Sequence, residues 1–160
     1  MEQNELNRIL NEHKLWLNGT GGKEANLYGA DLRGADLRGA NLRGANVKYT
    51  KGIIMACPEE GSFIAFKKCR DDRIVKLEIL VDAKRSSATG RKCRCDKAKV
   101  LSISDINGIE EFDEAISKYD SDFVYKVGEI VSVEYFCDDR WDECASGIHF
   151  FITRQEAVEY

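Results

Sequence analysis

The 160-residue sequence has one proline and two histidines, and no apolar run reaches the ~20 residues that a membrane-spanning helix needs. Its first residues, 1–5, are polar and acidic, which argues against a secretory signal peptide. We therefore expect a protein of the cytoplasm without membrane contact. In that compartment its six cysteines are reduced thiols rather than disulfides.

Recognised motifs for metal binding and catalysis are also missing. The sequence contains no Cys-x-x-Cys pair, no Gly-x-x-x-x-Gly-Lys-Ser/Thr loop, no Gly-x-Ser-x-Gly and no His-Glu-x-x-His. We consequently predict no catalytic residue, no metal and no cofactor. Two alternatives stay open: a zinc site from Cys93, Cys95, Cys144 and His149, and a nucleophilic pair of Cys144 with His149.

The net charge of −4 conceals a strong asymmetry along the chain. Residues 67–99 contain 12 basic and 5 acidic side chains, whereas residues 110–160 contain 4 basic and 14 acidic ones. Such an asymmetry indicates either separate surfaces for charged partners or two segments that neutralise each other. The sequence alone does not choose between these interpretations.

A repeat of five residues runs without a gap from Ala25 to Tyr49, and its units read Ala-Asp/Asn-Leu-Arg-Gly with small variations. A period of five fits neither an α-helix nor a flat strand, because those have periods of 3.6 and 2. It fits a coil that turns a corner every five residues. We expect the alanine of each unit to point inward. We expect the same of the large apolar residues, which are Leu27, Leu32, Leu37, Leu42 and Val47.

These units resemble the pentapeptide-repeat family. The resemblance implies a short right-handed quadrilateral β-helix of about one coil. Family members that imitate duplex DNA have many coils and an acidic outer face. Here Asp31 and Asp36 alternate with Arg33, Arg38 and Arg43, so duplex DNA mimicry is not expected. An apolar stripe at helical spacing predicts a cap helix before the repeat (Leu6, Ile9, Leu10, His13 and Leu17).

The only proline, Pro58, together with Gly61 marks a domain boundary. We divide the chain into a cap helix and Gly-rich link (1–22), the repeats (23–50), a linker (51–61) and a C-terminal domain (62–160). Alternating apolar residues predict an α+β domain with a mainly antiparallel sheet. The expected elements are strands at 62–67, 74–81, 100–103 and 148–152, a helix at 109–119, a hairpin at 123–136, and a capping box of Thr153 with Glu156.

The C-terminal segment resembles the domain of unknown function found in short pentapeptide-repeat proteins of bacteriophages and prophages. The resembling stretches are residues 61–68, 84–94 and 144–151. The resemblance implies an accessory protein that acts in the cytoplasm of an infected host. It does not bring a function with it.

The segment 82–99 combines basic side chains with hydroxyl groups and a glycine, a composition that suits the binding of phosphate. Trp141 and His149 could stack on or hydrogen-bond a base. The alternative is a solvated basic loop beside a core strand that holds His149. The candidate ligand-binding residues are therefore Lys84, Arg85, Ser86, Ser87, Thr89, Arg91, Lys92, Arg94, Trp141 and His149.

Three functions follow as hypotheses. The first is an accessory binding protein that sequesters or inhibits a host factor, either a host protein or a small nucleotide-like ligand. The second is an enzyme for a nucleotide or NAD-like substrate, because residues 147–157 resemble a stretch of ADP-ribosyltransferase-like folds. The third is a structural module that forms homo-oligomers through the repeat or the C-terminal domain.

Overall fold

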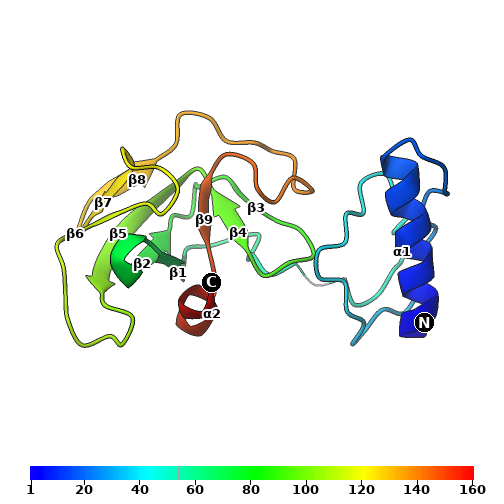
Figure 1. Cartoon of the computed structure of the whole chain (residues 1–160), viewed down its shortest axis with the longest axis horizontal. Coiled ribbons are helices and arrows are strands. Elements are labelled where there is room, and N and C mark those ends of the chain that lie inside the picture. Colours follow the sequence, from blue (N-terminus) through cyan, green and yellow to red (C-terminus); the bar gives the residue numbers. More distant parts are fainter. Residues whose placement is uncertain (54) are drawn as a thin grey trace. The chain divides into compact units, whose positions relative to one another are not determined.

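The computed structural model describes residues 1–53 and 55–160, and these divide into two compact units (Figure 1). The first unit consists of residues 1–55 and 88–90, and the second of residues 56–87 and 91–160. The chain is α+β, with an N-terminal helix and mostly antiparallel strands. Among the described residues, we find no helix with the length and apolarity to cross a membrane.

The first unit begins with the expected helix, α1 (Gln3–Leu17), which buries Leu6 and His13. His13 is a packed helix residue: its Nδ1 accepts a hydrogen bond from the Ala25 N–H at 3.1 Å, and its ring stacks on Trp16 at 5.3 Å. The helix ends at Asn18, and Gly19 follows with a left-handed φ of 67°. The helix thus attaches to the first repeat through a side chain rather than through apolar contact alone.

The first four pentapeptides each close a turn in which an alanine N–H donates to the carbonyl of the preceding leucine, as Ala30 does to Leu27 at 3.0 Å. In the fifth, the Thr50 N–H donates to the Val47 carbonyl. The chain returns beside itself after four such units, so that Asn26 pairs with Asn46 and Asp31 with Lys51 in parallel bridges. The four leucines of the repeat are buried as expected. Val47 is 39% exposed instead, because the repeat ends two residues later and no further pentapeptide follows to cover it.

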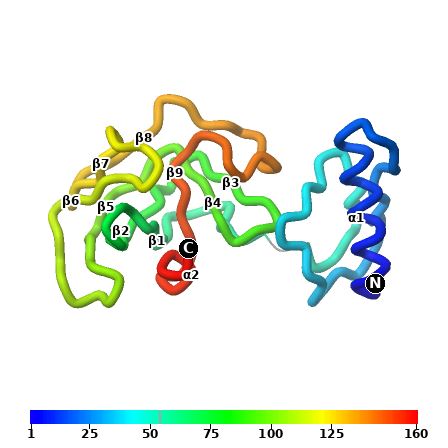
Figure 2. Tube along the Cα trace, viewed as in Figure 1, coloured from blue at the N-terminus to red at the C-terminus, as the bar shows by residue number. Residues whose placement is uncertain are grey.

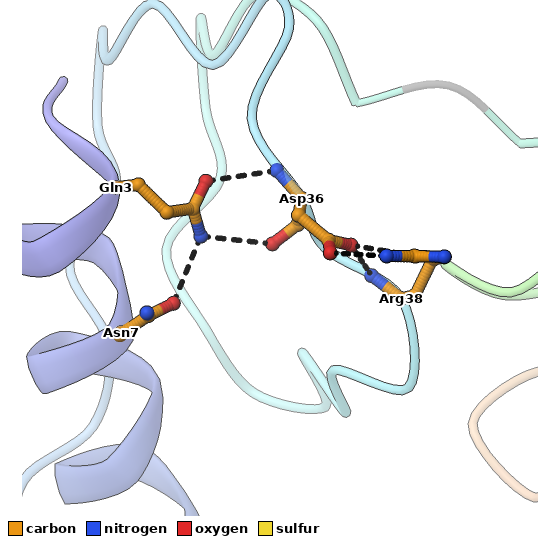
Figure 3. A network of polar contacts seen from close by, with 4 residues as sticks. All are labelled: Gln3, Asn7, Asp36 and Arg38. Carbon is orange, nitrogen blue, oxygen red and sulfur yellow. Dashed lines mark hydrogen bonds and ion pairs between the residues drawn. The ribbon is translucent and has the colours of Figure 1, made fainter.

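The first turn of α1 pairs with the repeat through an amide side chain (Figure 3). The Gln3 amide accepts from the Asp36 N–H at 2.9 Å and donates to the Asp36 carbonyl at 3.2 Å. Its nitrogen also donates to Asn7 Oδ1 at 2.8 Å. The two bonds to Asp36 are those that a neighbouring strand would form, so Gln3 caps the main chain at this point.

The second unit contains a four-stranded antiparallel sheet in the order β1-β2-β5-β8. Its strands are β1 (Phe63–Lys68), β2 (Ile74–Ile79), β5 (Lys97–Ser104) and β8 (Ile130–Ser132), and the short 3-10 helix η1 (Arg70–Asp72) joins the first two. Alternate residues of β2 and β5 face the core, among them Val75, Leu77 and Ile79, which are fully buried. This sheet forms one wall of the hydrophobic core.

A three-stranded antiparallel sheet forms the other wall, in the order β3-β4-β9 (Figure 2). It consists of β3 (Arg85–Ser87), β4 (Cys93–Cys95) and β9 (Ile148–Phe150). A third pair, β6 (Glu114–Ile116) with β7 (Val124–Lys126), adds Ala115 and Tyr125 to the same core. The final helix α2 (Arg154–Glu159) begins at the expected capping box of Thr153 and Glu156.

Two expected elements are wrong. Residues 109–119 form no helix, because the Asp105 carboxylate accepts from the N–H groups of Ile109 and Glu110 and turns the chain back toward β5. Residues 123–136 form no hairpin. The turn at Gly128 is bonded to Val100 of β5, so β7 pairs with β6 while β8 joins the four-stranded sheet.

Candidate functional site

Strand register determines which of the sequence-predicted residues come together. Ser86 of β3 lies opposite Arg94 of β4, which lies opposite His149 of β9. Neighbouring residues of the strands alternate between faces, so Cys93, Cys95, Ile148 and Phe150 point into the core. The other face carries Ser86, Arg94 and His149, with Lys92 just before β4, and we call these four residues the β4–β9 face.

Arg94 holds the covering segment, residues 136–147, onto this face. Its guanidinium is buried and donates to the carbonyls of Cys137, Asp139 and Ser146 at 2.9, 2.8 and 3.1 Å. The guanidinium carbon also lies 5.4 Å from the centre of the Phe136 ring. Arg94 therefore positions a loop, and its donors are engaged by protein groups.

His149 lies half-buried beneath the same segment. Its Nε2 is 3.1 Å from the Glu143 carbonyl, an oxygen that can only accept. Burial, then the charges of Lys92 and Lys67, lower the pKa of His149 to about 4. At neutral pH the imidazole is consequently uncharged, with its proton on Nε2 and an acceptor lone pair on Nδ1.

Positive charge collects around this neutral imidazole. Lys67 is buried and donates to the His149 carbonyl at 3.3 Å, and burial lowers its pKa. Lys92 Nζ lies 3.6 Å from Cys144 Sγ and 5.8 Å from the centre of the Tyr160 ring. Within the part of the chain that the structure describes, no carboxylate forms an ion pair with Lys67, Lys92 or Arg94.

Ser86 adds a neutral polar group to the face. The residue is buried, and its hydroxyl oxygen has no hydrogen-bond partner among the described residues. A buried hydroxyl without a partner is costly, by about 1–3 kcal/mol. Together with the unpaired positive charges, this composition suits an anionic ligand.

The remaining candidate residues lie elsewhere. Arg85 donates to the carbonyls of Gly61, Leu80, Val81 and Ala83, and thereby fixes a turn. The Ser87 hydroxyl accepts from the Cys57 N–H, the Thr89 hydroxyl donates to the Ala40 carbonyl within the first unit, and Arg91 pairs with Glu156 at 2.5 Å. Lys84 is exposed, and Trp141 belongs to the covering segment, where its main-chain N–H donates to the Asp139 carboxylate.

The two alternatives based on cysteine are not supported. Cys93 and Cys95 point into the core while His149 lies on the opposite face of the sheet, so they cannot share a zinc ion with it. The described residues contain no group of three or more potential metal ligands. Cys144 lies next to Lys92, and His149 Nε2 is engaged by Glu143 instead.

Sequence reasoning missed Lys67, although a signal for it existed. Ala65 and Lys67 stand two residues apart in β1 and are both buried, so the strand predicted at 62–67 already placed this lysine on the same side as the small Ala65. The sequence analysis likewise proposed no binding role for Arg73 or for the acidic segment near β6. A groove of about 680 Å³ in the first unit, lined by Asn7, Asn11 and Asn41 among others, contains none of the predicted site residues.

Comparison with known proteins places these features in a family. Residues 53–157 match a family of unknown function (DUF5758). The matched range includes all four residues of the β4–β9 face. Residues 23–51 match pentapeptide repeats (8 copies), a model with more copies than the five contiguous units found here. No curated protein and no solved structure matches the chain. Because the first match spans well over half of its length, the chain belongs to the family of unknown function DUF5758, joined to a short pentapeptide repeat.

Proposed function

We propose that this protein is a binding module that captures a phosphate-bearing, nucleotide-like ligand on the β4–β9 face. The observation that carries the proposal is the position of Lys92 and Arg94 beside a neutral His149, where no carboxylate of the described residues forms an ion pair with either cation. An anion bound there would complete the electrostatic balance of the site. Lys92 and His149 are only partly buried. Lys92 is the group proposed to contact the phosphate, and the acceptor lone pair on His149 Nδ1 is proposed to meet a donor group of the same ligand.

The other residues of the face have supporting roles. Arg94 is a positioning residue, since its guanidinium donors hold the covering segment. Trp141, half-buried in the covering segment, offers an aromatic surface on which a base could stack.

The biological setting belongs to the same proposal. The resemblance to short phage and prophage proteins supports an accessory role in the cytoplasm of an infected host, where the module would sequester or inhibit a host factor. The acidic surface of a host protein is the competing ligand for the same positive charges. The enzymatic alternative stays a prediction that the experiment below also tests.

We also propose that the repeat winds as a right-handed quadrilateral β-helix of little more than one coil. Parallel bridges from residue 26 to 46 and from 31 to 51 support a coil of four pentapeptides. The Gln3 amide on Asp36 supports α1 as its cap. The short coil would then serve to support the second unit rather than to imitate DNA.

Titration of the His149 imidazole by NMR tests the binding proposal, with inorganic phosphate, AMP, ATP and NAD as probes. An anion beside the imidazole favours its protonated form, so a binding probe raises the pKa of His149 from about 4. Lys92→Ala should weaken binding at least ~10-fold, which corresponds to ~1.4 kcal/mol. Lys84→Ala removes the same charge from an exposed position and should leave binding unchanged.

Two results would overturn the proposal: no probe shifts His149 up to millimolar concentration, or both lysine variants weaken binding equally. Chromatography of the same mixtures after overnight incubation reports turnover. Cleavage of a probe that stops in His149→Gln would favour the enzymatic alternative over simple capture.

A further inference from the structure

A groove of about 570 Å³ lies on the second unit, away from the β4–β9 face. Its apolar lining consists of Leu101 and Ile103 of β5 together with Phe112 and Val127. The groove exists because β5 is paired at two separate places along one edge. Phe112 N–H bonds to the Ile103 carbonyl, and Gly128 N–H bonds to the Val100 carbonyl, which leaves Leu101 between them.

Acidic side chains surround this apolar surface. Glu111 and Asp113 line the groove, both are exposed, and neither carboxylate forms an ion pair within the described residues. The surrounding segment, residues 105–134, contains nine acidic and two basic side chains. The same segment also exposes two large apolar side chains, Ile109 at 83% and Ile130 at 59%.

The ring of Phe112, which lines the groove, already stacks against one cation of the same chain. The Arg73 guanidinium lies 4.0 Å from the centre of the Phe112 ring and donates to the Glu114 carbonyl at 2.7 Å. The other basic groups nearby are Lys76, which lies opposite Ser102 in the sheet, and Lys126 next to Val127. With Lys118 of the same segment these make four positive charges against nine carboxylates, so the field at the groove favours a positively charged partner.

We propose that this groove is the docking site for a basic amphipathic segment of a partner protein. An apolar side chain of the partner fills the space between Leu101, Phe112 and Val127. Its lysines or arginines pair with Glu111 and Asp113 at the rim. The proposal concerns a surface of its own and does not depend on the β4–β9 face.

A labelled 12-residue peptide that places lysine and leucine on opposite helical faces is the probe, and fluorescence anisotropy is the measurement. Glu111→Gln/Asp113→Asn removes two charges at the groove, whereas Asp120→Asn/Asp122→Asn removes two charges from exposed positions outside it. We expect the groove pair to weaken binding ~10-fold and the control pair to change it less than ~2-fold. Val127→Ser should weaken binding at unchanged charge, and a glutamate–leucine peptide should not bind.

Several results would overturn the proposal. Equal weakening by both double variants would show general attraction to an acidic protein. Failure of the lysine–leucine peptide to bind at low salt would exclude a basic amphipathic segment as the ligand of the groove. Self-association of the chain that Glu111→Gln/Asp113→Asn abolishes, without peptide binding, would assign the groove to a second copy. Because phosphate binding is measured at His149, either proposal can fail while the other stands.

Discussion

Arg94 satisfies three carbonyls of the covering segment with one guanidinium, and the side chain is 2% exposed. Hydrogen bonds to a charged donor in such surroundings are stronger than neutral ones. The same side chain is therefore unsuitable as a neutral test of ligand binding, since its removal changes the structure of the site. Lys92, which is only partly buried, is the better choice.

Arg94→Ala should lower the free energy of unfolding by about 2–4 kcal/mol, because three carbonyls lose their donor and the covering segment loses its attachment. Urea titration followed by circular dichroism measures this loss. Lys84→Ala, at an exposed neighbouring position, should stay within ~0.5 kcal/mol of the parent. A loss of stability as small as that of the control would show that the three hydrogen bonds do not hold the segment.

His149 predicts a pH dependence of stability. Its pKa is about 4 in the folded protein and 6.5 in an ordinary environment, so the unfolded chain binds a proton first as the pH falls. The contribution of the neutral imidazole is complete above pH ~6.5 and is lost as the pH falls toward ~4. Thermal unfolding at pH 7, 5.5 and 4.5 should show a steeper loss for the parent than for His149→Gln. Parallel curves for the two proteins would contradict the low pKa.

At the scale of elements, local signals predicted α1, β1, β2, β9 and the capping box of α2 because each depends on neighbours in sequence. The pairing partners of β7 and β8 could not be predicted. The turn at Gly128 is typical of a hairpin, and only its hydrogen bond to Val100 directs the two strands into different sheets. Tertiary contact overrides the local signal there.

The sequence likewise predicted the residue types of the candidate site, but it did not predict how the fold brings them together. Ser86, Lys92, Arg94 and His149 were identified by residue type, whereas the grouping of His149 with the other three depends on the pairing of β4 with β9, more than 50 residues apart in the chain. The helical spacing at 109–119 misled for a related reason. Ile109 and Tyr119 have the period of a buried stripe, yet both are largely exposed.

The repeat allows a matched test of stacking between its turns. Gly52 and Gly34 both have a left-handed φ, +88° and +79°, so alanine strains the main chain similarly at either position. A Cβ at Gly52 would overlap the main chain of Leu32 and Arg33, whereas one at Gly34 meets nothing within 4 Å. Gly52→Ala should therefore cost at least ~1 kcal/mol more than Gly34→Ala in urea unfolding. Equal costs would contradict the contact between residues 52 and 32–33.

At the scale of the whole chain, most charges of the basic segment 67–99 are not paired with those of the acidic segment 110–160 in the ion pairs among the described residues. Arg91 with Glu156 joins the basic segment to the acidic one, but Lys68 pairs with Asp72 and Lys97 with Asp82 within the basic segment itself. Positive charge thus remains on the β4–β9 face, and negative charge remains around the groove of β5. Both surfaces lie on the second unit, so both binding proposals concern this unit alone.

The six thiols report on the integrity of that unit. Cys144 is exposed and Cys137 is half-buried, whereas Cys57, Cys69, Cys93 and Cys95 are buried. Burial also raises the pKa of Cys69 to about 11, and the reactive thiolate is therefore scarce at neutral pH. Brief treatment of the native protein with iodoacetamide should modify Cys144 first and Cys137 more slowly, as peptide mass spectrometry will show.

The buried thiols should react only through opening of the core, at a rate that urea increases together with global unfolding. Cys144→Ser should remove the fast phase and leave the slow one unchanged. Labelling of Cys93 or Cys95 at the rate of Cys144 would mean that the three-stranded sheet opens freely. A β4–β9 face built on that sheet could not then hold Ser86, Arg94 and His149 in one row, and the binding proposal would fail with it.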